Sequence, residues 1–170
     1  MGARILATAL LAFGVGLAGA ANALSYTLSA ILDGLQEVPP VATPGTGTMT
    51  GTYDDVTNLL SWSGSFSSLI GTTTAAHFHG PAAVGVSAAV RLGITIPTGV
   101  TAGVFAGSAT ISNAFEAELL TGLWYLNIHS SYRPGGEIRG QVLATVVPEP
   151  AVLSLFAAAG LAALATRRRR

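Results

Sequence analysis

The sequence predicts an all-β domain, an antiparallel Greek-key β-sandwich with one short helix, between two hydrophobic terminal helices. Two observations favour this fold class. Apolar and polar residues alternate with period two in short segments, and Gly, Pro, Asn or Asp bounds each segment. Turn signals recur about every ten residues, which is typical of sandwiches built from short strands. Three parts follow: residues 1–23, a domain at 24–147 and a terminal segment at 148–170.

Eight strands are expected in the domain, at residues 24–32, 46–53, 59–66, 73–79, 87–94, 103–111, 123–129 and 137–145. Asp54, Asp55 and Asn58 mark a hairpin turn between the second and third of these strands. The prolines at 39, 40 and 44 indicate an extended connection between the first two strands.

A short helix is expected at residues 114–120, after the sixth strand. Asn113 can cap its amino end, Glu116 lies three residues later as in a capping box, and Gly122 can end it. The last two strands should form a hairpin through residues 132–136, in which Gly135 or Gly136 takes a positive φ.

The amino end predicts export. Residues 1–23 contain Arg4, an apolar run and a small-residue close at 21–23, which is the pattern of a secretory signal peptide. Cleavage after Ala23 would leave Leu24 as the first mature residue.

The carboxyl end predicts a membrane span with a basic cytoplasmic tail. An apolar run at residues 151–166 precedes four arginines, which the positive-inside rule places in the cytoplasm with the domain outside. This ending resembles the PEP-CTERM sorting signal of exported bacterial proteins. The residues that carry the resemblance are Pro148, Glu149, Pro150, Arg167, Arg168, Arg169 and Arg170. It implies inner-membrane anchoring, processing by an exosortase, and then a cell-surface or extracellular location.

The composition of residues 24–147 excludes several functions. This part of the chain contains seven carboxylates, only three arginines and no lysine. A basic surface for binding nucleic acid is therefore not expected. The absence of cysteine excludes thiol catalysis and thiolate metal ligands. No nucleophile elbow or phosphate-binding glycine motif occurs, so no catalytic residues are assigned.

All three histidines are candidate metal ligands. His77 and His79 share one face of a strand, since side chains alternate, and His129 lies on the face opposite Trp124. If they meet, three neutral imidazoles would suit copper or zinc. The alternative is a hydrogen-bond network without metal, and the residues leave both open.

Three polar residues accompany the histidines. Asn127 lies two residues before His129, and Glu137 and Arg139 follow the turn. Glu137 could accept the spare N–H of a histidine, or it could pair with Arg139 in an ordinary ion pair. Arg139 could also bind a ligand carboxylate. Trp62 and Trp124 are expected in the core rather than as platforms for sugars.

Four ordered motifs resemble the CHRD domain, over about residues 25–143. They are LDGLQEVPP at 32–40, LSW at 60–62, HFHGP at 77–81, and NIH at 127–129 with GEIRGQ at 136–141. The resemblance implies an immunoglobulin-like or superoxide-dismutase-like sandwich. Because catalytic motifs are absent and a sorting signal is present, the sequence favours a non-enzymatic surface or matrix protein with one CHRD binding module, associated with exopolysaccharide or biofilm. The alternative is a histidine-ligated metal protein with redox activity. Without a disulfide, and with three histidines, a superoxide dismutase assignment is disfavoured.

Overall fold

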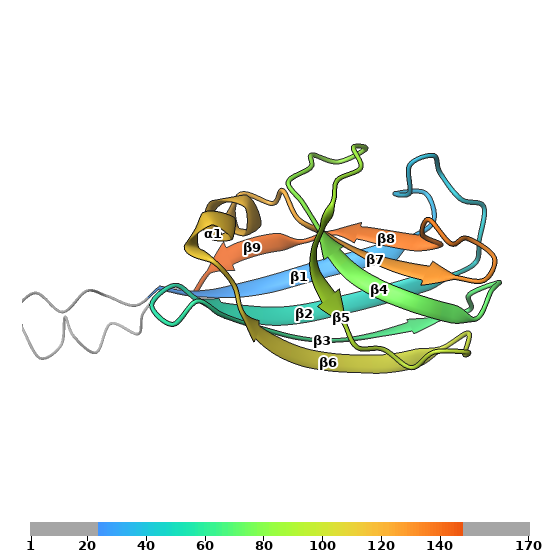
Figure 1. Cartoon of the computed structure of the whole chain (residues 1–170), viewed down its shortest axis with the longest axis horizontal. Coiled ribbons are helices and arrows are strands. Elements are labelled where there is room, and N and C mark those ends of the chain that lie inside the picture. Colours follow the sequence, from blue (N-terminus) through green and yellow to red (C-terminus); the bar gives the residue numbers. More distant parts are fainter. Residues whose placement is uncertain (1–23, 148–170) are drawn as a thin grey trace, which may run out of the picture.

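The computed structural model describes residues 24–147, which form nine strands and one helix (Figure 1). In chain order these are β1 (Ser25–Asp33), β2 (Thr46–Asp54), β3 (Leu59–Ser67), β4 (Thr73–His79), β5 (Val90–Ile94), β6 (Gly103–Thr110), α1 (Asn113–Leu120), β7 (Tyr125–Ser130), β8 (Ile138–Gln141) and β9 (Leu143–Val146). The expected terminal helices lie outside the described residues. Within residues 24–147, no helix has the length and hydropathy to cross a membrane.

All strand pairs are antiparallel and belong to one continuous sheet in the order β5-β4-β7-β8-β1-β2-β3-β6, with β9 also paired to β1. The sheet curls into a nearly closed barrel, whose open seam lies between β5 and β6. The antiparallel all-β prediction with one short helix is thus confirmed. The ladders do not divide into two sheets, however, because β1 pairs with β2 on one side and with β8 and β9 on the other. The Greek-key, immunoglobulin-like and superoxide-dismutase-like details stay predictions.

Two predicted strands differ from those observed by more than two residues or by a break. The strand expected at 137–145 is two strands, because the amide of Val142 leaves the ladder and donates to the carbonyl oxygen of Trp124 at 2.8 Å. Val142 is fully buried between them. The strand expected from residue 87 begins at Val90, since residues 80–89 form a loop over the sheet.

The barrel interior is apolar and is formed by alternate residues of each strand. In β2, Met49 and Tyr53 point inward while the threonines between them face solvent, as period two requires. Trp62 and Trp124 lie on either side of Phe78, with ring centroids 5.4 and 5.9 Å from it. Both tryptophans are buried, so the expected core role is confirmed.

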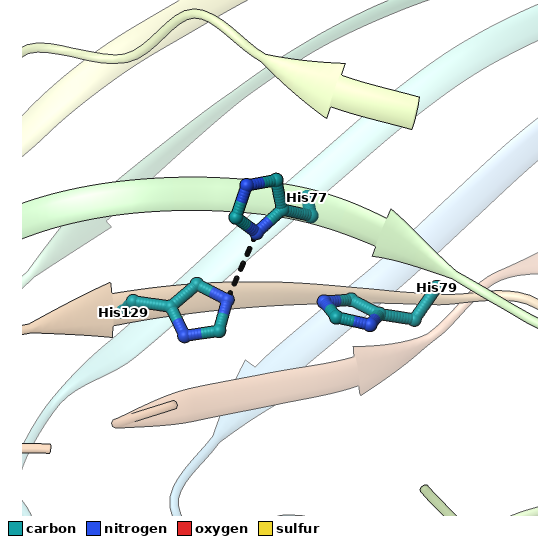
Figure 2. Close-up of side chains that lie close together, drawn as sticks. All are labelled: His77, His79 and His129. Carbon is teal, nitrogen blue, oxygen red and sulfur yellow. Dashed lines mark hydrogen bonds between the residues drawn. The ribbon is translucent and has the colours of Figure 1, made fainter. Parts of the chain in front are cut away.

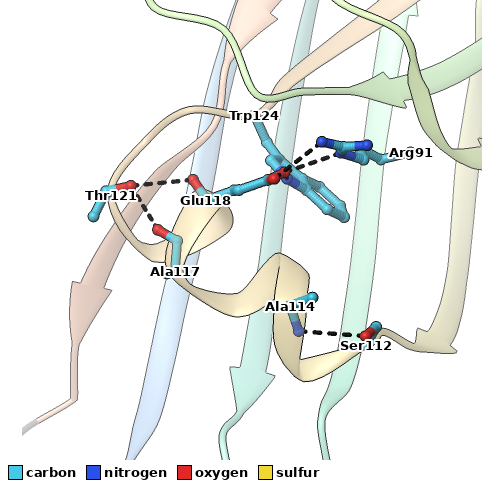
Figure 3. A network of polar contacts seen from close by, with 7 residues as sticks. All are labelled: Arg91, Ser112, Ala114, Ala117, Glu118, Thr121 and Trp124. Atoms are coloured by element: carbon cyan, nitrogen blue, oxygen red, sulfur yellow. Dashed lines mark hydrogen bonds and ion pairs between the residues drawn. The ribbon is translucent and has the colours of Figure 1, made fainter.

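Helix α1 packs beside β9 and is held by a polar network (Figure 3). Its N-cap is Ser112 rather than Asn113, because the Ser112 hydroxyl accepts from the Ala114 amide at 3.3 Å. The expected capping box is therefore not formed. Gly122 follows the helix with φ +74, as expected.

The carboxylate of Glu118 fixes this helix to the sheet. It accepts two hydrogen bonds from Arg91 of β5, at 2.9 and 3.0 Å, and one from the indole nitrogen of Trp124 at 3.2 Å. The network is structural, and it leaves the histidine side of β4 and β7 free for a site.

Candidate metal centre

The three histidines converge on the outer face of β4 and β7, as the sequence predicts (Figure 2). Phe78 and Ile128 point into the core, so alternation turns His77, His79 and His129 outward. Antiparallel register sets His129 opposite Ala75, diagonally across from His77. The candidate ligand nitrogens all lie within 4.8 Å of one another.

Backbone carbonyl groups set the tautomers of two histidines. Nδ1 of His79 lies 3.0 Å from the carbonyl oxygen of Ala88, and Nδ1 of His129 lies 2.9 Å from that of Pro134. A carbonyl oxygen only accepts, so in the neutral rings both Nδ1 atoms carry the hydrogen. Both Nε2 atoms therefore present a lone pair to the cluster.

His77 completes the triangle. Its Nδ1 lies 3.0 Å from Nε2 of His129, so it donates its hydrogen to that lone pair. Acting as a metal ligand through Nδ1 would require this hydrogen to move to Nε2 of the same ring, which keeps the imidazole neutral. The hydrogen-bonded pair of His77 and His129 and a site with three nitrogen ligands thus differ only in the tautomer of His77.

His79 carries the clearest signal of a missing partner. It is 9% exposed, and its Nε2 atom is buried without a hydrogen-bond partner. Burial lowers the pKa of His79 despite the opposing hydrogen bond to Ala88, and burial likewise lowers the pKa of His129. Both rings are held in the neutral form, which is the form that binds metal ions.

The geometry fits copper or zinc. Nitrogen ligands at about 2.0–2.1 Å in a tetrahedral arrangement lie roughly 3.3 Å apart, so small side-chain movements would bring the three nitrogens onto one ion. Three imidazoles without a carboxylate or thiolate suit zinc and copper better than calcium or magnesium. A fourth position would remain for water or a ligand.

Glu137 forms neither of its two expected contacts. Its buried carboxylate accepts hydrogen bonds from the hydroxyl of Thr43 at 2.7 Å, from the amides of Ile70 and Gly71 at 2.6 and 3.1 Å, and from the hydroxyl of Ser130. Although burial acts to raise it, these bonds hold the pKa of Glu137 below its usual value. Glu137 therefore anchors the loop after β3, and it bonds neither a histidine nor Arg139.

Arg139 lies in a stack beside the cluster instead. Its guanidinium carbon is 3.4 Å from the ring centroid of Tyr125, and its Nη2 donates to the carbonyl oxygen of Val86 at 2.7 Å. Tyr125 stacks on His79, with centroids 4.9 Å apart and an interplanar angle of 5°. The role of Tyr125 as the support of His79 was not predicted from the sequence.

Asn127 lies in β7 between Tyr125 and His129 and is buried. Its Nδ2 donates to the carbonyl oxygen of Gly135 at 3.4 Å, while its Oδ1 is buried without a partner. No hydrogen bond joins it to the three histidines. The neighbouring Glu37, which sequence reasoning placed in a motif but not in a site, is also buried with an unpartnered Oε1.

The candidate sorting residues, Pro148, Glu149, Pro150 and Arg167 to Arg170, lie outside the described residues. The comparisons with known proteins address them directly: the PEP-CTERM protein-sorting motif matches residues 146–170. The CHRD domain matches residues 28–142, which is more than half of the chain. Neither a curated protein nor a solved structure matches the chain. The chain therefore belongs to the CHRD domain family and carries a carboxyl-terminal PEP-CTERM sorting motif.

Proposed function

We propose that this chain is an exported surface protein, sorted by an exosortase, whose CHRD domain binds one copper or zinc ion through His77, His79 and His129. The PEP-CTERM motif implies processing at the membrane and release to the surface. Three converging imidazoles supply the ligand set.

The observation that carries the metal proposal is the buried Nε2 atom of His79. A neutral nitrogen acceptor is costly to bury without a partner, and a bound ion would remove this cost. The hydrogen bonds from His79 and His129 to carbonyl groups support the same conclusion, because metal-binding histidines are commonly oriented by an acceptor at the other ring nitrogen.

The proposed role is binding rather than catalysis. Glu137, for which a contact with a histidine was one of two sequence-based alternatives, instead anchors a loop. Arg139 is stacked on Tyr125 and bonded to Val86, so it is not free to bind an anionic substrate. Association with exopolysaccharide or matrix belongs to the proposal as the setting in which a sorted surface protein acts.

Metal content tests the proposal. The purified full chain is stripped with chelator, titrated with Cu²⁺ and separately with Zn²⁺, dialysed, and assayed by elemental analysis. About one ion per chain is expected, and at least about tenfold weaker binding in His77→Ala, His79→Ala and His129→Ala, since each removes one of three ligands. Asp55→Asn, an acidic surface residue in the β2–β3 turn, is the matched control.

Two results would contradict this assignment. If the triple histidine variant bound as much metal as the wild type, the ion would lie elsewhere. If the copper-loaded chain dismutated superoxide, and His79→Ala abolished that turnover, the protein would be an enzyme and the binding role would be wrong.

A further inference from the structure

A second pocket lies beside the histidine face and takes no part in the metal proposal. It has a volume of about 360 Å³, within the range of about 300–1,000 Å³ of small-molecule sites. The loop after β1 contributes Glu37, Pro39 and Pro40, and the β7–β8 turn contributes Tyr132, Arg133 and Gly136. The first of these segments belongs to the LDGLQEVPP motif, of which the hydrophobic core contains Leu32 but not Glu37 or the prolines.

The loop after β1 is built to turn Glu37 inward. Oδ1 of Asp33 accepts the amide of Gln36 at 3.0 Å, and Nε2 of Gln36 donates to the carbonyl oxygen of Ile31 at 2.8 Å. The carbonyl oxygen of Gly34 accepts the amides of Glu37 and Val41, at 3.2 and 2.8 Å. These bonds hold the loop through its backbone and through the side chains of Asp33 and Gln36.

The carboxyl group of Glu37 nevertheless lies inside, with 7% of the residue exposed and Oε1 unpartnered. Oδ1 of Asn127 is unpartnered as well. Both atoms adjoin Gly136, since a Cβ atom there would lie 2.5 Å from Oε1 and 2.4 Å from Oδ1. Nδ2 of Asn127 lies 2.5 Å from the same position but donates to the carbonyl oxygen of Gly135. Two buried acceptors without hydrogen-bond partners beside one pocket indicate a ligand that brings hydroxyl or amine hydrogens.

The surrounding charges select a neutral ligand. The positive charge of Arg139 acts on Glu37 from within, and Arg133 lies at the rim with its guanidinium carbon 4.6 Å from the ring centroid of Tyr132. Burial raises the pKa of Glu37 to about 7, against the attraction of Arg139. Two cations around a partly protonated acid disfavour an ammonium group or a divalent cation. The two unpartnered buried oxygens disfavour an anion, so hydroxyl groups of a neutral ligand are the expected donors.

The rim supplies an apolar surface to accompany these acceptors. Tyr132 is 38% exposed and lines the pocket together with Pro39, Pro40 and Pro134. An aromatic ring and proline rings contact C–H groups, while carboxyl and amide oxygens accept from hydroxyl groups. We propose that this pocket binds a neutral sugar residue, with Glu37 accepting hydrogen bonds from its hydroxyl groups and Tyr132 contacting its ring.

The proposal has a structural requirement. Oε1 is covered, so the side chain of Glu37 must turn toward the pocket when the sugar binds. The β7–β8 turn forms both the pocket wall and, through Pro134, the acceptor of His129. Sugar binding itself needs no metal ion, which allows the two proposals to be tested separately.

The test is saturation-transfer NMR on the full chain in a zwitterionic detergent with excess EDTA. The probes are methyl glucoside, methyl galactoside and methyl mannoside. The comparison ligands are methyl glucuronide, methylammonium and Ca²⁺. Binding of Ca²⁺ is measured by calorimetry in the absence of chelator. At least one neutral glycoside should give saturation transfer. The signal should fall at least about fivefold in Glu37→Met, which keeps the side-chain length but removes both oxygens, and in Tyr132→Ala.

Leu35→Ala is the matched control, because Leu35 lies in the same loop, is largely exposed and does not line the pocket. It should bind as the wild type does. The proposal is overturned if no neutral glycoside binds, if binding survives both pocket substitutions, or if only methylammonium or Ca²⁺ binds. Tyr132→Ala alters an exposed side chain, so it keeps the test decisive even if Glu37→Met fails to fold.

Discussion

Replacing Gly136 by alanine tests how the β7–β8 turn, the Glu37 loop and Asn127 fit together. Gly136 has φ +135, a conformation that side chains with a Cβ atom rarely adopt. A Cβ atom would lie 2.4 Å from Oδ1 and 2.5 Å from Nδ2 of Asn127, and 2.5 Å from Oε1 of Glu37. Both neighbours are buried, so neither can swing into solvent.

The magnitude follows from two costs. Backbone strain at such a φ costs about 1–3 kcal/mol, and forcing atoms into a filled interior costs about 1–3 kcal/mol more. Alanine lowers the entropy of the unfolded chain, which offsets only about 0.4–1 kcal/mol. The free energy of unfolding should therefore fall by about 1–6 kcal/mol, which lowers Tm by roughly 4 °C or more in a domain of this size.

Thermal unfolding followed by tryptophan fluorescence measures this change, because Trp62 and Trp124 are buried in the core. Gly135→Ala is the control in the same turn, since a Cβ atom at Gly135 meets nothing within 4 Å and its φ is not positive. It should leave Tm unchanged or slightly raised. Equal melting temperatures for the two variants would refute the packing of this turn.

Four further outcomes are expected. The wild type should lose stability relative to Glu37→Gln as pH rises from about 5 to about 8. Burial raises the pKa of Glu37 to about 7 in the folded state, so ionisation of the carboxyl group destabilises the folded wild type, whereas glutamine does not ionise. Parallel profiles of Tm against pH for the two proteins would contradict this. Zinc at about 100 times its Kd should stabilise the chelator-treated wild type by about 2.7 kcal/mol, and the same concentration should stabilise His79→Ala by about 1.4 kcal/mol or less, since the variant binds at least about tenfold more weakly. A fragment of residues 24–147 should melt within a few degrees of the full chain, since β9 ends at Val146 and the Val147 amide closes the ladder on Ser25. Mass spectrometry of the surface-located protein should find the arginine tail removed, and an intact carboxyl terminus would indicate a permanent anchor.

Local patterns were enough to predict most strands and the histidine cluster. Alternation fixes which side of a strand each residue faces, so the outward placement of His77, His79 and His129 follows from Phe78, Trp124 and Ile128. The hairpin of β7 and β8 and its positive-φ glycine follow from the Pro-Gly-Gly sequence in the same way. These features depend on neighbours within a few residues.

Features that depend on distant segments were not predictable. The alternation of apolar and polar residues does not predict which strands pair, and so it did not predict that β1 pairs with β8 and β9 as well as with β2. Because of this pairing, the strands form one curled sheet in place of the two expected sheets. The alternation also does not predict that loops cover the polar face of β7. Arg139 and Asn127 read as surface residues in the sequence, yet both are buried.

The covering loops, and not a carboxylate, supply the groups that orient the histidines. His79 and His129 are oriented by the carbonyl groups of Ala88 and Pro134, which sequence patterns cannot identify because every residue carries a carbonyl group. Glu137 is committed to the amides of Ile70 and Gly71, so it stabilises a loop rather than the imidazoles.

This division of roles partly separates the two ends of the GEIRGQ motif from its middle. Gly136 leaves room for Glu37 and Asn127, and Gln141 donates to the carbonyl oxygens of Ala82 and Gly122 at 2.9 and 2.6 Å, which holds loops over the sheet. Arg139 also holds a covering loop, through the carbonyl oxygen of Val86, and in addition it contacts the ring of Tyr125, which stacks on His79. A substitution of Gln141 should therefore loosen the loops, whereas a substitution of Arg139 should both loosen the loop at residues 80–89 and remove the stack that supports His79. The same short motif thus contributes to the cover of the site at its ends and its centre, and it supports a candidate ligand from its centre.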